Sequence, residues 1–363
     1  MKLVFYNPVL VRDESNRHLP GMERFSTFFK FYNNAVVLLD RTGTLKIPIQ
    51  TQSVFPIPAL RPFSKTLEEV CNERACELLR HVDKLGTPLY VLYSGGIDST
   101  LVLVSLLKNA TPSEKKNIIV LLNKESIQEN PSFYADHIRG QLRTESSGMF
   151  GFLMGTNNVF VGGECGDQLF GTDRLLDIIT RFGGQSLHAP YSRDIFFTYF
   201  NSSLNDGDLT NYWLDIFERL KGAATVPITT NAEFIWWISF ALKWHAVFFR
   251  ILSYASSRNA PNISRAYVAT RYFHFYNTDD FQLWSLNNPD KKIRDTWRSY
   301  KWPCKDIIYD FTKDADYRDN KTKHGSQFFL LKHMEPHNFI DDSFHLYRTL
   351  DAKQYYNPDN DFL

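Results

Sequence analysis

The sequence predicts an α/β fold with a parallel sheet, a largely helical C-terminal half and a small β-rich N-terminal segment. Residues 89–93 and 118–122 are continuous apolar runs, as expected for strands that are covered on both faces in a parallel sheet. Residues 159–161 are a third candidate strand. After about residue 190 such runs give way to long amphipathic segments, which favours helices there.

Residues 1–62 are predicted to form the small β-rich lead-in. Short apolar runs at residues 29–40 and 45–49 flank the turn residues 41–44, which is typical of a β-hairpin. A stiff connector follows, because three prolines lie between residues 56 and 62. We therefore expect three segments along the chain: the lead-in 1–62, a main domain 63–345 and a polar tail 346–363.

Helix signals mark the start of the main domain and of its second half. After Thr66, apolar residues recur at helical spacing through Val82. A strand, a glycine turn and a helix then follow between residues 89 and 108. Further on, Thr230 and Glu233 form the capping-box pattern that opens the long amphipathic segment 231–256.

Composition narrows the class of protein. The 363 residues carry a formal net charge of +1, so the overall field gives no strong attraction to nucleic acid, and we expect no nucleic-acid partner. The most hydrophobic stretch, residues 234–242, is far shorter than the roughly 20 residues that span a bilayer, so we expect a core helix and no membrane contact. With no C-x-x-C pair among four cysteines and no signal-peptide pattern, we expect a cytoplasmic protein.

Residues 94–100 read SGGIDST and lie where the first predicted strand passes into a helix. Glycines allow the backbone to approach a phosphate closely, and the N–H groups at a helix N-terminus favour an anion. No lysine follows the glycines, which excludes the Walker A pattern. The segment therefore predicts a phosphate-binding loop of another kind.

The sequence S-G-G-x-D-S after a strand resembles the signature of the PP-loop ATP-pyrophosphatases, which cleave ATP between its α and β phosphates. The resemblance implies a HUP-like nucleotide-binding domain that uses ATP and Mg²⁺. By similarity, one set of residues would hold the phosphates: Ser94, Gly95, Gly96 and Ser99. Asp98 would bind the nucleotide and help to hold Mg²⁺.

Residues 160–171 read FVGGECGDQLFG and resemble the S-G-E-G-S-D-E-x-F-G-G segment of asparagine synthetase. We expect Gly162 and Gly163 to bring backbone close to the nucleotide, and Asp167 to be a second Mg²⁺ ligand. The resemblance implies that Glu164 positions substrate or accepts a proton from the attacking amine. Cys165 stands where the family has a small residue, and we expect it only to pack.

Two weaker similarities lie further along the chain. Residues 271–283 resemble a structural landmark of the family. Residues 318–325, RDNKTKHG, resemble a basic stretch whose lysine stabilises departing pyrophosphate. We assign that role to Lys323, with Lys321 as the alternative.

The sequence also departs from asparagine synthetase. The glutaminase domain of that family needs a cysteine exposed by removal of the initiator Met, whereas residue 2 is Lys and no cysteine precedes Cys71. We therefore expect no glutamine hydrolysis in this chain, and a separately encoded glutaminase is one candidate partner for residues 1–62. Between residues 123 and 164 the family has room for a further strand and helix, so we expect a trimmed domain here.

The predicted reaction is AMP-forming amide synthesis. A small-molecule carboxylate would be adenylated by ATP and then attacked by ammonia or another amine, as in asparagine formation. Two alternatives stay open at this point. One is a PP-loop enzyme that modifies a nucleobase or tRNA, and the other is a degenerate ATP-binding protein with an interaction role.

Overall fold

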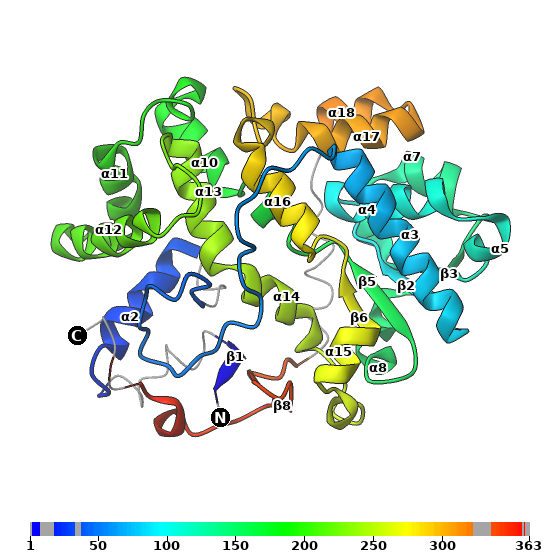
Figure 1. Cartoon of the computed structure of the whole chain (residues 1–363), viewed down its shortest axis with the longest axis horizontal. Helices are drawn as coiled ribbons and strands as arrows, with labels where there is room; N and C mark the ends of the chain where they lie inside the picture. The colour runs from blue at the N-terminus through cyan, green and yellow to red at the C-terminus, as the bar shows by residue number, and fades with distance from the viewer. Residues whose placement is uncertain (1, 8–17, 33–37, 322–334, 358, 360–363) are drawn as a thin grey trace.

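Five parallel strands form the central sheet of the protein, shown in Figure 1 as a computed structural model. The structure describes residues 2–7, 18–32, 38–321, 335–357 and 359. The strand order is β4-β3-β2-β5-β6, with Leu89 of β2 opposite Ile118 of β3 and Val159 of β5. The strand bounds are β2 Leu89–Leu92, β3 Ile118–Leu122, β4 Arg143–Ser146, β5 Val159–Gly162 and β6 Tyr272–His274.

The three predicted strands are confirmed as β2, β3 and β5, and two strands were not predicted. β4 is a largely exposed edge strand with the polar sequence RTES, which carries no apolar run. It lies between residues 123 and 164, so the segment that was expected to be trimmed still contributes a strand. β6 is only three residues long.

Helices make up most of the remaining structure. The longer α-helices are α3 Leu67–Leu85, α4 Ile97–Asn109, α10 Arg174–Phe182, α11 Arg193–Leu204, α12 Gly207–Gly222, α13 Asn231–Leu242, α14 Trp244–Leu252, α16 Asp279–Asn287 and α17 Trp302–Thr312. The shorter ones are α2 Met22–Phe28, α5 Pro112–Lys115, α6 Lys124–Glu129, α7 Pro131–Phe133, α8 Phe150–Leu153, α9 Gly166–Leu169, α15 Arg265–Arg271 and α18 Ala315–Asn320. Single turns are the 3-10 segments η2 Phe29–Tyr32, η4 Ser147–Met149, η5 Gly184–Ser186, η6 Ala260–Asn262, η7 Pro289–Lys291, η8 Trp297–Ser299 and η9 Ala352–Tyr355, and the π-helical turn η3 Tyr134–Ile138.

The predicted helix starts are confirmed. Thr66 caps α3 with Glu69 in a complete capping box, and Thr230 caps α13 with Glu233 in the same way. The segment predicted at residues 231–256 forms two helices, α13 and α14, that meet at Lys243 and are bent by 46°. The helical character of the second half therefore holds, with one break inside its longest apolar segment.

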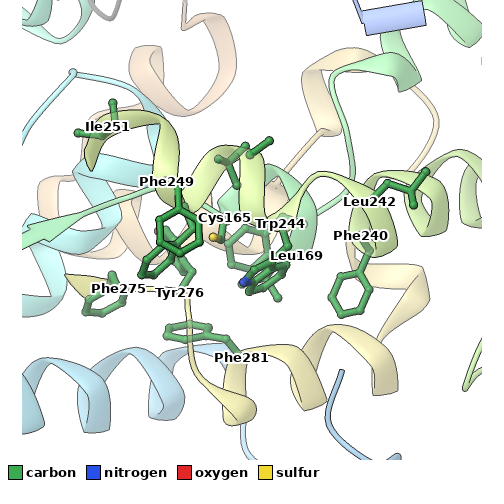
Figure 2. Packing of buried hydrophobic residues seen from close by; sticks show 14 of the residues in the cluster. Cys165, Leu169, Phe240, Leu242, Trp244, Phe249, Ile251, Phe275, Tyr276 and Phe281 are labelled. Carbon is green, nitrogen blue, oxygen red and sulfur yellow. The ribbon is translucent and has the colours of Figure 1, made fainter. Parts of the chain in front are cut away.

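α13 and α14 lie in the core. Their side chains pack with α9, with the residues after β6 and with α16, and Figure 2 shows Cys165, Trp244 and Tyr276 in this cluster. Within the described part of the chain, no single helix is long and apolar enough to cross a membrane. The bent pair α13 and α14 passes that test by length and composition, but nearly all of its residues are buried.

A second, smaller sheet joins the two ends of the chain. Its strand order is β1-β7-β8, with β1 Leu3–Tyr6, β7 Phe339–Asp341 and β8 Leu346–Tyr347 paired antiparallel. β1 belongs to the expected lead-in and β8 to the expected tail. In Figure 1 the blue β1 lies beside the orange and red C-terminal strands.

The hairpin predicted in the lead-in is wrong for the residues that the structure describes, where the lead-in contains the strand β1, the helix α2 and the turn η2. Residues 29–32 form the 3-10 turn η2, and residues 45–49 form no strand, while residues 33–37 of the predicted hairpin lie outside the described part. The turn at residues 41–44 does form, because the Asp40 carboxylate accepts hydrogen bonds from the backbone N–H groups of Thr42, Thr44 and Leu45.

The chain before that turn pairs with a helix end instead of with a second strand. The N–H groups of Leu39 and Arg41 donate to the carbonyls of Leu242 and Ala241, at the C-terminus of α13. The last carbonyls of a helix lack partners within the helix, so these two hydrogen bonds satisfy carbonyls of α13 as well as the N–H groups of residues 39 and 41. It removes the backbone donors that a hairpin would need.

Candidate functional site

The two predicted glycine-rich motifs meet at the carboxyl ends of two inner strands of the central sheet. β2 and β5 are adjacent and parallel, so the turns that follow them, residues 93–96 and 163–165, lie side by side. From β2 the chain continues to β3 and β4 on one side of the sheet, whereas β5 leads to β6 on the other. Such a switch point is where open α/β sheets bind ligands.

The serines of the first motif hold the loop between β2 and α4 in shape. Ser94 Oγ lies 3.0 Å from Ser99 Oγ and accepts a hydrogen bond from the Gly96 N–H at 3.2 Å. Ser99 Oγ accepts from the Ser94 N–H and donates to the Gly96 carbonyl. The loop thus leads directly into α4, whose first N–H groups have no partners within the helix.

Gly95 is required by the loop's conformation. Its φ is +76°, in the left-handed region that favours glycine. A Cβ at this position would lie 2.4 Å from the Ser126 carbonyl oxygen and 2.8 Å from Glu129 Cβ, so α6 packs directly against the loop backbone. The hydroxyl of Tyr317, which is distant in the sequence, donates a hydrogen bond to the Gly95 carbonyl.

The glycines after β5 allow the second motif to pack against the first. A Cβ on Gly163 would lie 3.0 Å from the Ser99 nitrogen, and one on Gly162 would lie 2.9 Å from His274 Nδ1. A Cβ on Gly166 would reach within 2.5 Å of the Asp98 carboxylate carbon. The backbone of the second motif therefore lies directly against the first turn of α4.

Cys165 lies between these glycines and takes no part in the polar contacts of the site. Its φ of 72° is in the left-handed region, and its side chain is buried. Burial raises the pKa of its thiol well above the usual value, which keeps it neutral and unreactive. The expectation that it only packs is consistent with this environment.

A buried lysine connects the two predicted metal ligands. Lys301 Nζ lies 2.6 Å from Asp98 Oδ2 and 2.6 Å from Asp167 Oδ1. Burial raises the pKa of Asp98 to about 6, because Lys301 offsets only part of the desolvation and Asp167 opposes ionisation. Burial alone would lower the pKa of Lys301, but the attraction of Asp167 and Asp98 outweighs it, so that pKa is raised.

Glu164, the predicted catalytic carboxylate, forms an ion pair with Arg250 of α14. Arg250 Nη2 lies 2.7 Å from Glu164 Oε2. The carboxylate raises the pKa of Arg250, so the guanidinium is a fixed positive charge beside Glu164. The ion pair fixes the position of the Glu164 carboxylate in the turn after β5.

The alternative pyrophosphate lysine, Lys321, lies beside the loop. Its Nζ is 2.7 Å from Glu129 Oε1, and both side chains are nearly buried. Glu129 in turn contacts the backbone of the loop, since a Cβ on Gly96 would lie 3.4 Å from Glu129 Oε1. Lys323, our first choice from the sequence, lies outside the described residues.

The residues present fit a phosphate group. At Gly95, Gly96 and Gly163 the backbone lies beside the start of α4 without a Cβ atom, and α4 is long enough to have a well-developed N-terminal dipole. An open hollow of about 620 Å³ lies between the ends of β3 and β4 and the start of α6, and none of the residues that line it belongs to the two glycine-rich turns. Its volume is in the range of small-molecule sites.

The pair Asp98 and Asp167 does not fit a divalent cation held by the protein alone. The Lys301 ammonium already fills the space between the two carboxylates. Among the described residues, moreover, no group of three or more His, Cys, Asp or Glu side chains is arranged to hold a metal ion. We therefore derive no reaction step through Mg²⁺.

No protein-family model matches this chain, and no curated protein shows significant sequence similarity to it. The geometry of the site itself is thus the basis for any functional assignment.

Several residues of the site were not predicted from the sequence: Glu129, Arg250, Tyr276, Lys301 and Tyr317. Tyr276 donates from its hydroxyl to the Asp98 carbonyl at 2.9 Å, which gives the landmark segment at residues 271–283 a direct contact with the loop. The other four approach from helices or helix ends distant in sequence. Pro303 indicates that a helix starts after Lys301, but no local pattern indicates where that lysine points.

Proposed function

We propose that this chain is an ATP-dependent, AMP-forming amide ligase related to asparagine synthetase. The observation that carries the proposal is the adjacency of two glycine-rich turns, after β2 and β5, at the switch point of the parallel sheet. One turn opens a helix and suits a phosphate chain, and the other presents Glu164 beside it.

In the proposed first step, a carboxylate oxygen of the substrate attacks the α-phosphorus of ATP. The bond from that phosphorus to the bridging oxygen breaks, and its electron pair leaves with pyrophosphate. The N–H groups of Gly95 and of the first turn of α4 hold the phosphates. Lys321 or Lys323 complements the charge that develops on pyrophosphate.

In the second step, ammonia or another amine attacks the acyl carbon of the adenylate. The acyl–oxygen bond breaks, AMP leaves with the electron pair, and the amine nitrogen loses a proton. Glu164, held in position by Arg250, accepts that proton. A separately encoded glutaminase would be one source of ammonia, and co-purification from the native host tests for such a partner.

The decisive experiment is an assay of pyrophosphate and AMP release from ATP across a panel of amino-acid carboxylates with ammonia. Wild type should release pyrophosphate only with its own carboxylate, and Asp98→Asn and Glu164→Gln should each lower the rate by at least about 100-fold. Asp310→Asn, an exposed change on α17, is the matched control and should leave the rate unchanged. ATP binding without pyrophosphate release on any carboxylate would contradict the proposal.

A further inference from the structure

Lys301 is held in an unusual position by the surrounding structure. It precedes α17 with φ 57°, a left-handed conformation that residues with side chains rarely adopt. Its N–H donates to the Lys292 carbonyl, and its own carbonyl accepts from the Lys305 N–H. Only 3% of its surface is exposed, and its Nζ contacts Asp98 in the first turn of α4.

The ammonium group is fully coordinated by carboxylate oxygens. An ammonium has three N–H donors, and three oxygens lie within hydrogen-bond distance: Asp98 Oδ1 at 2.7 Å, Asp98 Oδ2 at 2.6 Å and Asp167 Oδ1 at 2.6 Å. Such lengths are at the short end for charge-assisted hydrogen bonds. Two negative charges and one positive charge thus meet in one place.

Both carboxylates are fixed around this ammonium by other contacts. The Tyr300 hydroxyl donates to Asp167 Oδ1 at 2.9 Å. On the other side, the backbone of Gly166 lies against the Asp98 carboxylate, where a side chain would collide with it. The cluster is therefore part of the folded framework, with the cation supplied by the chain itself.

We propose that Lys301 is the resident cation of this site and takes the place of a divalent metal between Asp98 and Asp167. Mg²⁺ binds oxygens at about 2.0–2.1 Å in octahedral geometry and would need the oxygens that Lys301 engages. The nucleotide-free protein accordingly binds no divalent ion at this pair. A metal that accompanies ATP enters with the phosphates.

This assignment can be tested by titrating the full chain with Mn²⁺ in the absence of nucleotide. The EPR signal of free Mn²⁺ measures how much of the ion is bound. Wild type and Asp98→Asn should bind Mn²⁺ equally weakly. Lys301→Met keeps the stem of the side chain but removes the charge, and it should gain one site with at least tenfold tighter binding. That gain should disappear in the double variant Lys301→Met/Asp167→Asn.

Lys313→Met, an exposed change at the other end of α17, is the matched control and should bind as wild type does. A wild-type Mn²⁺ site that is lost in Asp98→Asn would overturn the proposal, and this comparison holds even if Lys301→Met does not fold. A folded Lys301→Met that gains no site would overturn it as well. Because no substrate is present, the result is independent of whether the chain is a ligase.

Discussion

Lys321 forms an ion pair with Glu129, and Glu129 packs against the backbone of Gly95. The ion pair holds a cation at the end of α18 beside the loop between β2 and α4. The hydrogen bond from the Tyr317 hydroxyl to the Gly95 carbonyl is a second contact between α18 and this loop. The structure thus places the lysine that was second choice from the sequence within the candidate site.

Lys321→Met tests the role of this cation. We expect pyrophosphate release to fall by about 100-fold, because a preorganised positive charge would no longer complement the leaving group. Glu129→Gln should give a smaller loss, since the lysine remains but is less firmly placed. Full activity in Lys321→Met together with inactivity in Lys323→Met would instead assign the role to Lys323.

Gly95→Ala tests the close packing of the loop. The substitution adds a side chain at φ +76°, which costs about 1–2 kcal/mol, and places its Cβ against the Ser126 carbonyl, for which we expect a further 1–3 kcal/mol or so. Gly86→Ala is the matched control, because Gly86 has φ +59° and open space around it.

The measurements are urea unfolding and ATP binding. Gly95→Ala should be the less stable of the two variants and should lose ATP binding, whereas Gly86→Ala should bind ATP as wild type does. Equal stability and equal ATP affinity in the two variants would show that the loop can move away from α6.

His274 should make stability depend on pH. Burial lowers its pKa to about 4, and its Nε2 lies 3.0 Å from the Phe248 carbonyl oxygen, so the ring is neutral in the folded state at pH 7. The unfolded chain takes up a proton near pH 6.5, before the folded protein does. Stability is therefore complete above pH 6.5 and falls as the pH drops from 6.5 towards 4.

From these values we expect His274 to account for a loss of roughly 2 kcal/mol in the free energy of unfolding between pH 7 and pH 5. Urea unfolding at both pH values measures it. His274→Gln should reduce the loss by that amount, although His245, also buried with a lowered pKa, will leave some pH dependence. An unchanged pH dependence in His274→Gln would contradict the assignment.

Arg41 should be the main attachment of the lead-in to the rest of the chain. Its guanidinium donates to the carbonyls of Phe55, Pro56 and Phe240, and lies 4.3 Å from the centre of the Trp244 ring. Arg41→Met leaves these buried carbonyls without a donor, and we expect it to destabilise the protein by about 3–5 kcal/mol.

Limited proteolysis and thermal unfolding check this expectation. Cleavage between residues 38 and 62 should become faster in Arg41→Met, while Arg61→Met, an exposed arginine in the same segment, should behave as wild type does. Equal protection of the two variants would mean that the small sheet alone holds the lead-in in place.

The features that could be predicted are those that local sequence determines. Continuous apolar runs identified β2, β3 and β5, and threonine followed by glutamate identified the starts of α3 and α13. The glycines placed both motifs on turns that follow strands. That the two turns lie together follows from the pairing of β2 with β5.

What could not be predicted depends on contacts between distant segments. Arg250 and Lys301 reach the site from α14 and from the start of α17, and nothing near them in the sequence indicates a partner. The edge strand β4 has no apolar run, because little of it is buried. The predicted hairpin failed because residues 39 and 41 pair with the end of α13, a contact that the pattern of residues 29–49 does not contain.

The small sheet also constrains the order of folding. Tyr6 pairs with Phe339, far along the sequence, so the apolar strand LVFY lacks its antiparallel strand partner until the segment around residues 339–341 has been synthesised. Contacts of such long sequence separation form late, and an unpaired apolar strand can associate with other chains in the meantime. We therefore expect nascent chains of this protein to need protection by a chaperone at residues 3–6 until that segment emerges.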